Sequence, residues 1–163
     1  MFRPMRRKRQ MLSQEQCYGL LASGSNATLA VVGDGGWPYA VPVSYVYSGG
    51  KIYLHSAPTG HKVDAIRRCD RVSLCVIGQD QVVPEEFTTY FRSVIVFGRA
   101  RILESEADCL PALRLLGRKY SPGDEAGLSA EISKNKGRLV VIEITPEHIS
   151  GKEAIELVRA RKG

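Results

Sequence analysis

The chain has 163 residues, of which 44% are hydrophobic and 25% are charged, so it fits one soluble domain with a packed core. These fractions exclude collagen-like and disordered classes, and the absence of a run of about 18 apolar residues argues against a transmembrane helix. The formal net charge of +6 comes mostly from the N-terminal arm, residues 1–10, in which five residues are basic and none is acidic. We interpret this arm as a solvated terminus and expect no specific nucleic-acid partner.

The expected compartment follows from the N-terminus and the cysteines. No apolar segment follows the basic arm, so we expect no secretory signal. The four cysteines form no CxxC pair, which gives no support to a zinc ribbon or a thioredoxin-like motif. We therefore predict a cytoplasmic protein with reduced thiols and no membrane partner.

One helix and three strands are predicted in the first third of the chain. The helix covers Ser13–Ala22, with Ser13 as its cap. Alternation and turn residues predict strands over Ala27–Val32, Pro38–Tyr47 and Lys51–Ser56. The turns between these strands are too short for helices, so we expect a meander of three antiparallel strands. Pro42 cannot donate to a ladder, which places its strand at an edge or at a bulge.

The rest of the chain mixes strands and helices. We expect a polar loop over Gly78–Phe87, a helix that Pro111 kinks or shifts, and a last strand that Thr145-Pro146 ends. The predicted elements are a helix over Lys62–Arg68, strands over Val72–Ile77 and Thr89–Leu103, helices over Ser105–Tyr120 and Asp124–Lys134, a strand over Leu139–Ile144 and a helix over Glu153–Arg159. About six strands with few helices predict a mainly β fold, a six-stranded antiparallel barrel decorated by helices.

The segment YLHSAPTGHKVDAIRR, residues 53–68, has the chemistry of a phosphate site. A strand ends in His55-Ser56, a Pro/Gly loop follows, and His61 and Lys62 stand at a helix start, where free backbone N–H groups favour an anion. Lys62 supplies a charge, Ser56 a hydroxyl and His61 a second donor. On spacing alone, an ordinary turn that carries a surface lysine is the stronger interpretation. The sequence contains no P-loop, dinucleotide-binding or zinc-hydrolase motif.

Four strings, in order, carry a resemblance to a known family. They are YAVPVSYVY (39–47), YLHSAPTGHK (53–62), SVIVFGRARIL (93–103) and VIEITPEHISGK (141–152). Together they resemble the FMN-binding split barrels similar to pyridoxamine 5′-phosphate oxidase, and within them the nitroimidazole-resistance, or Nim-type, flavoproteins. The resemblance implies an FMN-binding split-barrel domain over residues 11–152, between the arm of residues 1–10 and a helical tail over residues 153–163.

The resemblance also implies a homodimer with FMN in a groove between the subunits. Carried over residue by residue, Val41, Pro42, Val43 and Ser44 run along the edge of the flavin ring. His55 and Ser56 line the ring and its phosphate-bearing chain, while His61 and Lys62 bind the phosphate. Ser93 approaches the flavin from the other chain. His55 is the expected catalytic residue, donating to the ring or to a small-molecule acceptor such as a nitroaromatic; the alternative is a structural histidine at a strand end.

The sequence departs from the oxidases at three places. His61-Lys62 stands where the oxidases have an arginine–lysine pair, and Ser93 stands where a glutamine is common. The chain ends in ISGKEAIELVRARKG, which does not match the segment that recognises the pyridoxal ring. These departures argue against a vitamin B6 oxidase. The alternative is a non-catalytic flavin- or haem-binding redox sensor on the same fold, with a deazaflavin as another cofactor.

Overall fold

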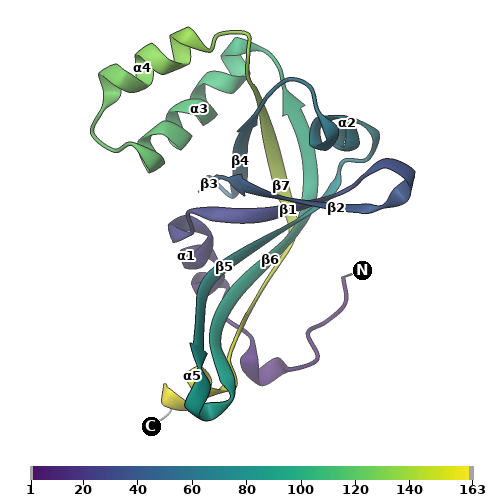
Figure 1. Ribbon diagram of the computed structural model, residues 1–163, viewed down its shortest axis with the longest axis vertical. Helices are drawn as coiled ribbons and strands as arrows, with labels where there is room; N and C mark the ends of the chain where they lie inside the picture. The colour runs from purple at the N-terminus through teal and green to yellow at the C-terminus, as the bar shows by residue number, and fades with distance from the viewer. Residues whose placement is uncertain (1, 162–163) are drawn as a thin grey trace.

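The computed structural model describes residues 2–161, so the first residue of the predicted arm and the last two of the predicted tail lie outside the described residues. Figure 1 shows a curled sheet with a two-helix projection at one end and a long arm of paired strands at the other. The strands are β1 Asn26–Val32, β2 Pro38–Ser44, β3 Val46–Ser48, β4 Lys51–Ser56, β5 Arg71–Val83, β6 Thr88–Leu103 and β7 Val140–Glu153. The helices are α1 Gln14–Ser23, α2 His61–Arg68, α3 Glu106–Tyr120, α4 Glu125–Lys134 and α5 Ile155–Ala160.

The strands form one antiparallel sheet in the order β2-β1-β5-β6-β7-β4-β3. The predicted mainly β barrel is confirmed, with seven strands rather than six. The predicted continuous strand over Pro38–Tyr47 is wrong, because it divides at Tyr45 into β2 and β3, which lie at opposite edges of the sheet. A single residue joins the two edges, so the sheet closes on itself there and the predicted three-strand meander does not form.

The barrel core explains the alternation in the strands. In β1 every second side chain is buried, and the same pattern recurs in β5 and β6. The first five residues of β7 are buried on both faces, because the barrel interior lies on one side and α3 packs on the other. The most buried large side chains of the core are Tyr45, Leu21, Leu29, Ile52, Leu54, Leu74, Ile142 and Ile144. This continuous apolar filling holds the sheet curved and fixes the ends of β2 and β4.

Two further strand boundaries differ from the predictions. The expected loop over Gly78–Phe87 is wrong up to Val83, because β5 continues to that residue and pairs with β6 along the arm, where both faces tolerate polar side chains. Only the turn over Pro84–Phe87 connects the two strands. The expected end of the last strand at Thr145-Pro146 is also wrong. Pro146 lies at the register shift between β6 and β7, where the ladder does not require its missing N–H, so β7 continues to Glu153.

The predicted helices are confirmed, with small differences at their ends. Ser13 and Gln16 form a capping box at the start of α1. α3 runs through Pro111, which is the sixth of its fifteen residues, so the helix starts before the proline and does not end there. Within residues 2–161, no helix has both the length and the apolar character needed to cross a bilayer. The predicted domain boundaries at residues 10 and 152 stay predictions, although buried Gln10 donates from its side chain to the carbonyl of Glu153 at 3.0 Å.

A buried carboxylate makes the stability of the barrel depend on pH. Glu143 on β7 accepts hydrogen bonds from Lys51 Nζ at 3.0 Å and from Arg101 Nε at 2.6 Å. Burial raises the pKa of the Glu143 carboxyl, but the bonds from Arg101 and Lys51 lower it more, so the pKa lies below its usual value. A carboxyl of this kind stabilises the fold above its unfolded pKa of about 4.3, and that contribution is lost as the pH falls through the folded pKa.

We therefore expect Glu143→Gln to lower the free energy of unfolding at neutral pH, with a difference from the unaltered chain that shrinks as the solution is acidified. Urea unfolding curves at a series of pH values measure this difference. Glu147→Gln is the matched control, because Glu147 also pairs with an arginine, Arg99, but is exposed. If the difference in free energy of unfolding between Glu143→Gln and the unaltered chain stayed constant as the pH was lowered, this account would be contradicted.

Candidate functional site

The β4–α2 corner, residues 55–62, joins the end of β4 to the start of α2. Gly60 precedes the helix with φ +128°, a conformation that favours glycine, and no side chain caps the first turn. The Ser56 hydroxyl is buried and has no hydrogen-bond partner within residues 2–161. Asp64, Arg67 and Arg68 of α2 form ion pairs, and His61 Nε2 lies 3.8 Å from an Asp34 carboxylate oxygen. No ion pair in the described chain includes Lys62. The corner thus combines free backbone donors, an unused hydroxyl and an unpaired ammonium group.

His61 is held by the turn between β1 and β2. Its ring stacks on Tyr39, with centroids 4.1 Å apart, and its Nε2 accepts from the backbone N–H of Asp34 at 3.3 Å. Arg68 fixes the Asp34 carboxylate with a hydrogen bond of 2.6 Å. Since Nε2 is occupied, only the Nδ1 atom of His61 is left to donate to a bound anion. The predicted phosphate role of His61 stays a prediction, and Lys62 is the less engaged of the two side chains within residues 2–161.

The strand β2 contains the segment that was predicted to run along the edge of the flavin ring. It is an edge strand of the described sheet and pairs with β1. Val41 and Val43 pack against the barrel core, while Pro42 and Ser44 are exposed on the other face. At an edge, the backbone groups that point away from β1 are left without a ladder partner. The predicted contacts of this segment are therefore backbone contacts along the free edge and side-chain contacts at Pro42 and Ser44.

His55 and Ser44 meet at a cavity of about 500 Å³, named here the His55 cavity, between the barrel and the α3–α4 pair. His55 is exposed on β4 and lies opposite Val141 of β7. The remaining lining residues are Leu113, Leu116, Gly117, Tyr120, Leu128, Glu131, Ile132, Asn135 and Leu139. The structure thus brings together two of the sequence-predicted residues and places a mainly apolar space beside them.

Ser93 is not brought to the β4–α2 corner within one chain. It lies on β6, between Ile77 of β5 and Lys152 of β7. The ladder registers place it on the same outer face of the sheet as Pro42 and Ser44, three inter-strand spacings or about 14 Å along the sheet. The outer face is defined here by the outward residues of β2 and β1, together with those of β5 from Ser73 to Ile77 and of β6 from Ser93 to Phe97. None of them is charged; they are Pro38, Ala40, Pro42, Ser44, Asn26, Thr28, Ala30, Val32, Ser73, Cys75, Ile77, Ser93, Ile95 and Phe97. Beyond this stretch, exposed Arg71 and Arg99 continue the same side of β5 and β6.

Two residues that the sequence analysis missed fix the corner where β2 passes into β3. Lys119 of α3 donates to the carbonyls of Gly24 and Tyr45, at 2.5 and 2.9 Å, and its ammonium lies 4.2 Å from the Tyr45 ring centre. Burial lowers the pKa of Lys119. The Tyr120 hydroxyl accepts from the Tyr45 N–H and donates to the Ser25 carbonyl. A helical lysine and tyrosine give no such signal in sequence, because their partners are backbone groups of distant segments.

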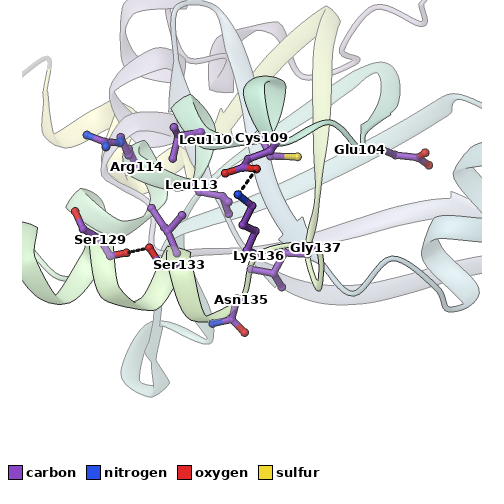
Figure 2. A pocket seen from close by; sticks show the side chains of 13 residues that line it. Glu104, Cys109, Leu110, Leu113, Arg114, Ser129, Ser133, Asn135, Lys136 and Gly137 are labelled. Carbon is purple, nitrogen blue, oxygen red and sulfur yellow. Dashed lines mark hydrogen bonds and ion pairs between the residues drawn. The ribbon is translucent and has the colours of Figure 1, made fainter.

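A second cavity, of about 410 Å³ and named here the Cys109 cavity, lies on another side of the α3–α4 pair. It shares Leu113, Ile132, Asn135 and Leu139 with the His55 cavity. Figure 2 shows Lys136 reaching from the segment after α4, and its Nζ lies 2.9 Å from the Glu106 carboxylate of α3. Burial raises the pKa of the Cys109 thiol, which donates to the Leu103 carbonyl and is therefore a structural group.

The sheet order, with its two edges joined through Tyr45, defines a split β-barrel. A family model described as pyridoxamine 5′-phosphate oxidase matches residues 13–153, which is most of the chain. The chain belongs to this family, as the four strings in the sequence predict.

Similar proteins include one curated relative and two solved structures. An uncharacterized protein of Rhizobium meliloti is 34% identical over 130 residues, covering 76% of this chain and 81% of the relative. The structure is similar to that of a FAD-binding protein from Mesorhizobium loti, with a TM-score of 0.62 and 28% identity over 89% of this chain and 97% of that one. It is also similar to a candidate 5-nitroimidazole antibiotic resistance protein from Bacteroides thetaiotaomicron, with a TM-score of 0.71 and 18% identity over 88% and 86% of the two chains.

Proposed function

We propose that this protein is a flavoprotein that binds FMN and, through it, reduces a small acceptor such as a nitroaromatic compound. The β4–α2 corner carries the proposal, because it offers the groups that a terminal phosphate requires. These are the uncapped N–H groups of α2, and Lys62 and the Ser56 hydroxyl, neither of which has a polar partner within residues 2–161. The FAD-binding relative from Mesorhizobium loti supports a flavin on this fold. The nitroimidazole-resistance structure suggests the acceptor class.

The residues of this chain have separate tasks in the proposal. When bound, the flavin supplies reversible two-electron chemistry, and the protein supplies orientation and hydrogen bonds. Lys62 and the start of α2 hold the phosphate, and the free edge of β2 at Val43 and Ser44 contacts the ring. His55, which lines the His55 cavity, donates a hydrogen bond to the ring or to the acceptor.

The absorbance spectrum of the protein as isolated tests the proposal most directly. We expect flavin bands, and chromatography of the released cofactor should identify FMN rather than FAD. A haem Soret band, or a colourless protein that fails to bind added FMN, would contradict the assignment. Turnover of a nitroaromatic compound with a chemical reductant then separates an enzyme from a flavin-binding sensor.

The outer face is the surface through which we propose that two chains pair, with one chain's Ser93 approaching the other chain's flavin. Three of its residues, Ile77, Ile95 and Phe97, are 62%, 39% and 40% exposed, and no carboxylate or arginine lies among the residues that define the face. An uncharged strip of this extent along a sheet is typical of a protein interface. We expect the protein to be a homodimer in solution.

Ile95→Lys is expected to shift the chain from dimer to monomer and to weaken FMN binding at the same time, since a buried lysine at the interface has no partner. Light scattering after size-exclusion chromatography gives the mass, and flavin fluorescence gives the affinity. Phe87→Lys is the matched control, because Phe87 is 98% exposed at the tip of the β5–β6 arm, away from the outer face. A stable monomer of the unaltered chain that retains FMN would overturn the shared groove.

His55→Gln tests the role of the histidine, because glutamine keeps a donor but does not titrate. If His55 acts at the ring or on the acceptor, one ionisation should disappear from the pH profile of acceptor turnover, while FMN affinity stays close to that of the unaltered chain. Steady-state rates across a pH series, with fluorescence titration of FMN, measure both quantities. Superimposable pH profiles would instead make His55 a structural residue at the end of β4.

A further inference from the structure

We propose that the His55 cavity is the binding site of the acceptor, and that it takes a neutral, flat and mainly apolar ring compound. The acceptor's role rests on the proposed function, whereas the binding itself is measurable without it. The inference comes from the incomplete packing of α4, from the chemistry of the residues that line the cavity, and from the position of the cavity beside His55 and Ser44.

The helix α4 leaves its apolar side chains only partly covered. Leu128 and Ile132 lie one turn apart on α4, yet no residue of this helix is buried. In Figure 1, α4 lies alongside α3 at the end of the molecule, and α3 is the element against which it packs most. A surface helix normally buries an apolar stripe of this kind against a core. Here two cavities flank the α3–α4 pair, so a bound molecule would complete the packing that the chain leaves open.

The lining of the His55 cavity selects the kind of molecule. Five of its eleven lining residues are aliphatic: Leu113, Leu116, Leu128, Ile132 and Leu139. No lysine or arginine lines it, and its one carboxylate, Glu131, accepts a hydrogen bond from Asn135 at 2.7 Å. Glu131 also lies 3.9 Å from Lys134 Nζ, but Lys134 does not line the cavity and its side chain is 75% exposed. An anion inside the cavity would therefore meet a carboxylate with no cation among the lining residues. The Cys109 cavity differs, since Arg114 and Lys136 line it, as Figure 2 shows.

Two polar residues, Ser44 and His55, lie at the barrel end of the cavity, whereas Glu131 and Asn135 lie at its α4 side. Ser44 ends β2 and His55 lies near the end of β4, the two places where we propose contacts with the flavin ring. Tyr120 contributes mainly its ring, because its hydroxyl already bonds the backbone at Tyr45 and Ser25. The volume of about 500 Å³ lies in the usual range for small-molecule sites, about 300–1,000 Å³. A ring compound bound here has its polar end beside His55 and the proposed flavin edge.

Equilibrium dialysis with menadione, a neutral naphthoquinone, tests the site, and naphthoquinone sulfonate is the anionic comparison. We expect the full chain to bind menadione more tightly than the sulfonate, with and without FMN. Leu128→Trp fills the His55 cavity and is expected to weaken menadione binding about tenfold or more, leaving the affinity for FMN unchanged. Leu110→Trp is the matched control, because Leu110 lies on α3 and lines only the Cys109 cavity.

A second variant avoids the risk that a tryptophan disturbs folding. Glu131 is exposed on α4, so Glu131→Lys keeps the fold and is expected to narrow or reverse the preference for menadione over the sulfonate. Equal effects of Leu128→Trp and Leu110→Trp, or a preference that Glu131→Lys leaves unchanged, would overturn the site. A parallel loss of FMN and menadione in Leu128→Trp would assign the cavity to the flavin and also overturn it. Menadione binding with the expected variant pattern, but no FMN binding, would support the site and reject the proposed function.

Discussion

Lys62→Ala is expected to weaken FMN binding about 10- to 150-fold while changing riboflavin binding little. The proposed phosphate lies at the start of α2, where Lys62 is the cation that no carboxylate in the described chain engages. A charge-assisted hydrogen bond contributes about 1.5–3 kcal/mol, which gives that range of affinity. Riboflavin lacks the phosphate, so it does not contact this charge. Fluorescence titration of the two ligands against the same protein preparation measures the ratio.

Lys134→Ala supplies the control for net charge, because Lys134 is also a helical lysine but its side chain is 75% exposed at the end of α4. This variant should leave both affinities unchanged. Equal losses of FMN and riboflavin in Lys62→Ala would mean that Lys62 has a structural role. The phosphate would then have to be held by the backbone groups of the β4–α2 corner and by Ser56 alone.

Tyr45→Ala is expected to lower the free energy of unfolding by about 3–5 kcal/mol, the usual range for removing a buried aromatic side chain. Tyr45 is fully buried, donates to the Leu21 carbonyl at 2.7 Å and packs its ring under the Lys119 ammonium. Burial raises the pKa of the Tyr45 phenol, which keeps this donor protonated. Urea unfolding, followed by circular dichroism, measures the change in free energy.

Tyr47→Ala is the comparison, because Tyr47 lies two residues further on but is only partly buried and stacks on Tyr18 at 6.0 Å. Tyr47→Ala should lower the free energy of unfolding clearly less than Tyr45→Ala does. Tyr45→Phe keeps the ring and removes only the bond to Leu21, so we expect a loss of about 1–3 kcal/mol. If Tyr45→Ala and Tyr47→Ala were equally destabilising, Tyr45 would have no special role in closing the barrel.

Local sequence signals predicted the elements whose cause is local. Ser13 and Gln16 form the capping box of α1 because the helix itself brings residues three apart together. The glycine turn Asp34–Gly36 separates β1 from β2 as expected, with positive φ at Gly35 and Gly36. The Pro/Gly loop before His61 likewise ends β4 and leads into α2 as expected, with positive φ at Gly60. These features depend on neighbouring residues, so one chain segment contains all the information.

The errors fall where a distant partner decides the structure. The polar part of β5 beyond Gly78 is a strand because β6 supplies its hydrogen bonds, and β7 passes Pro146 because a register shift removes the need for its N–H. Tyr45 divides a predicted strand because the barrel closes there and Lys119 and Tyr120 bond its backbone. None of these partners is close in sequence. Without them, a polar segment or a proline indicates a loop, and this is why the sequence prediction failed at these places.

The same division holds for the candidate site. The sequence by itself determined the β4–α2 corner: a strand end, a glycine loop and a helix start with Lys62 in its first turn are contiguous, and a helix start exposes N–H groups wherever it lies. Only the tertiary structure decided that Ser44 and His55 meet at one cavity, that α3 and α4 wall it, and that Ser93 lies on the outer face with Pro42. Those arrangements depend on strand register and barrel closure, which place residues from separate strands and helices side by side through packing of the whole core.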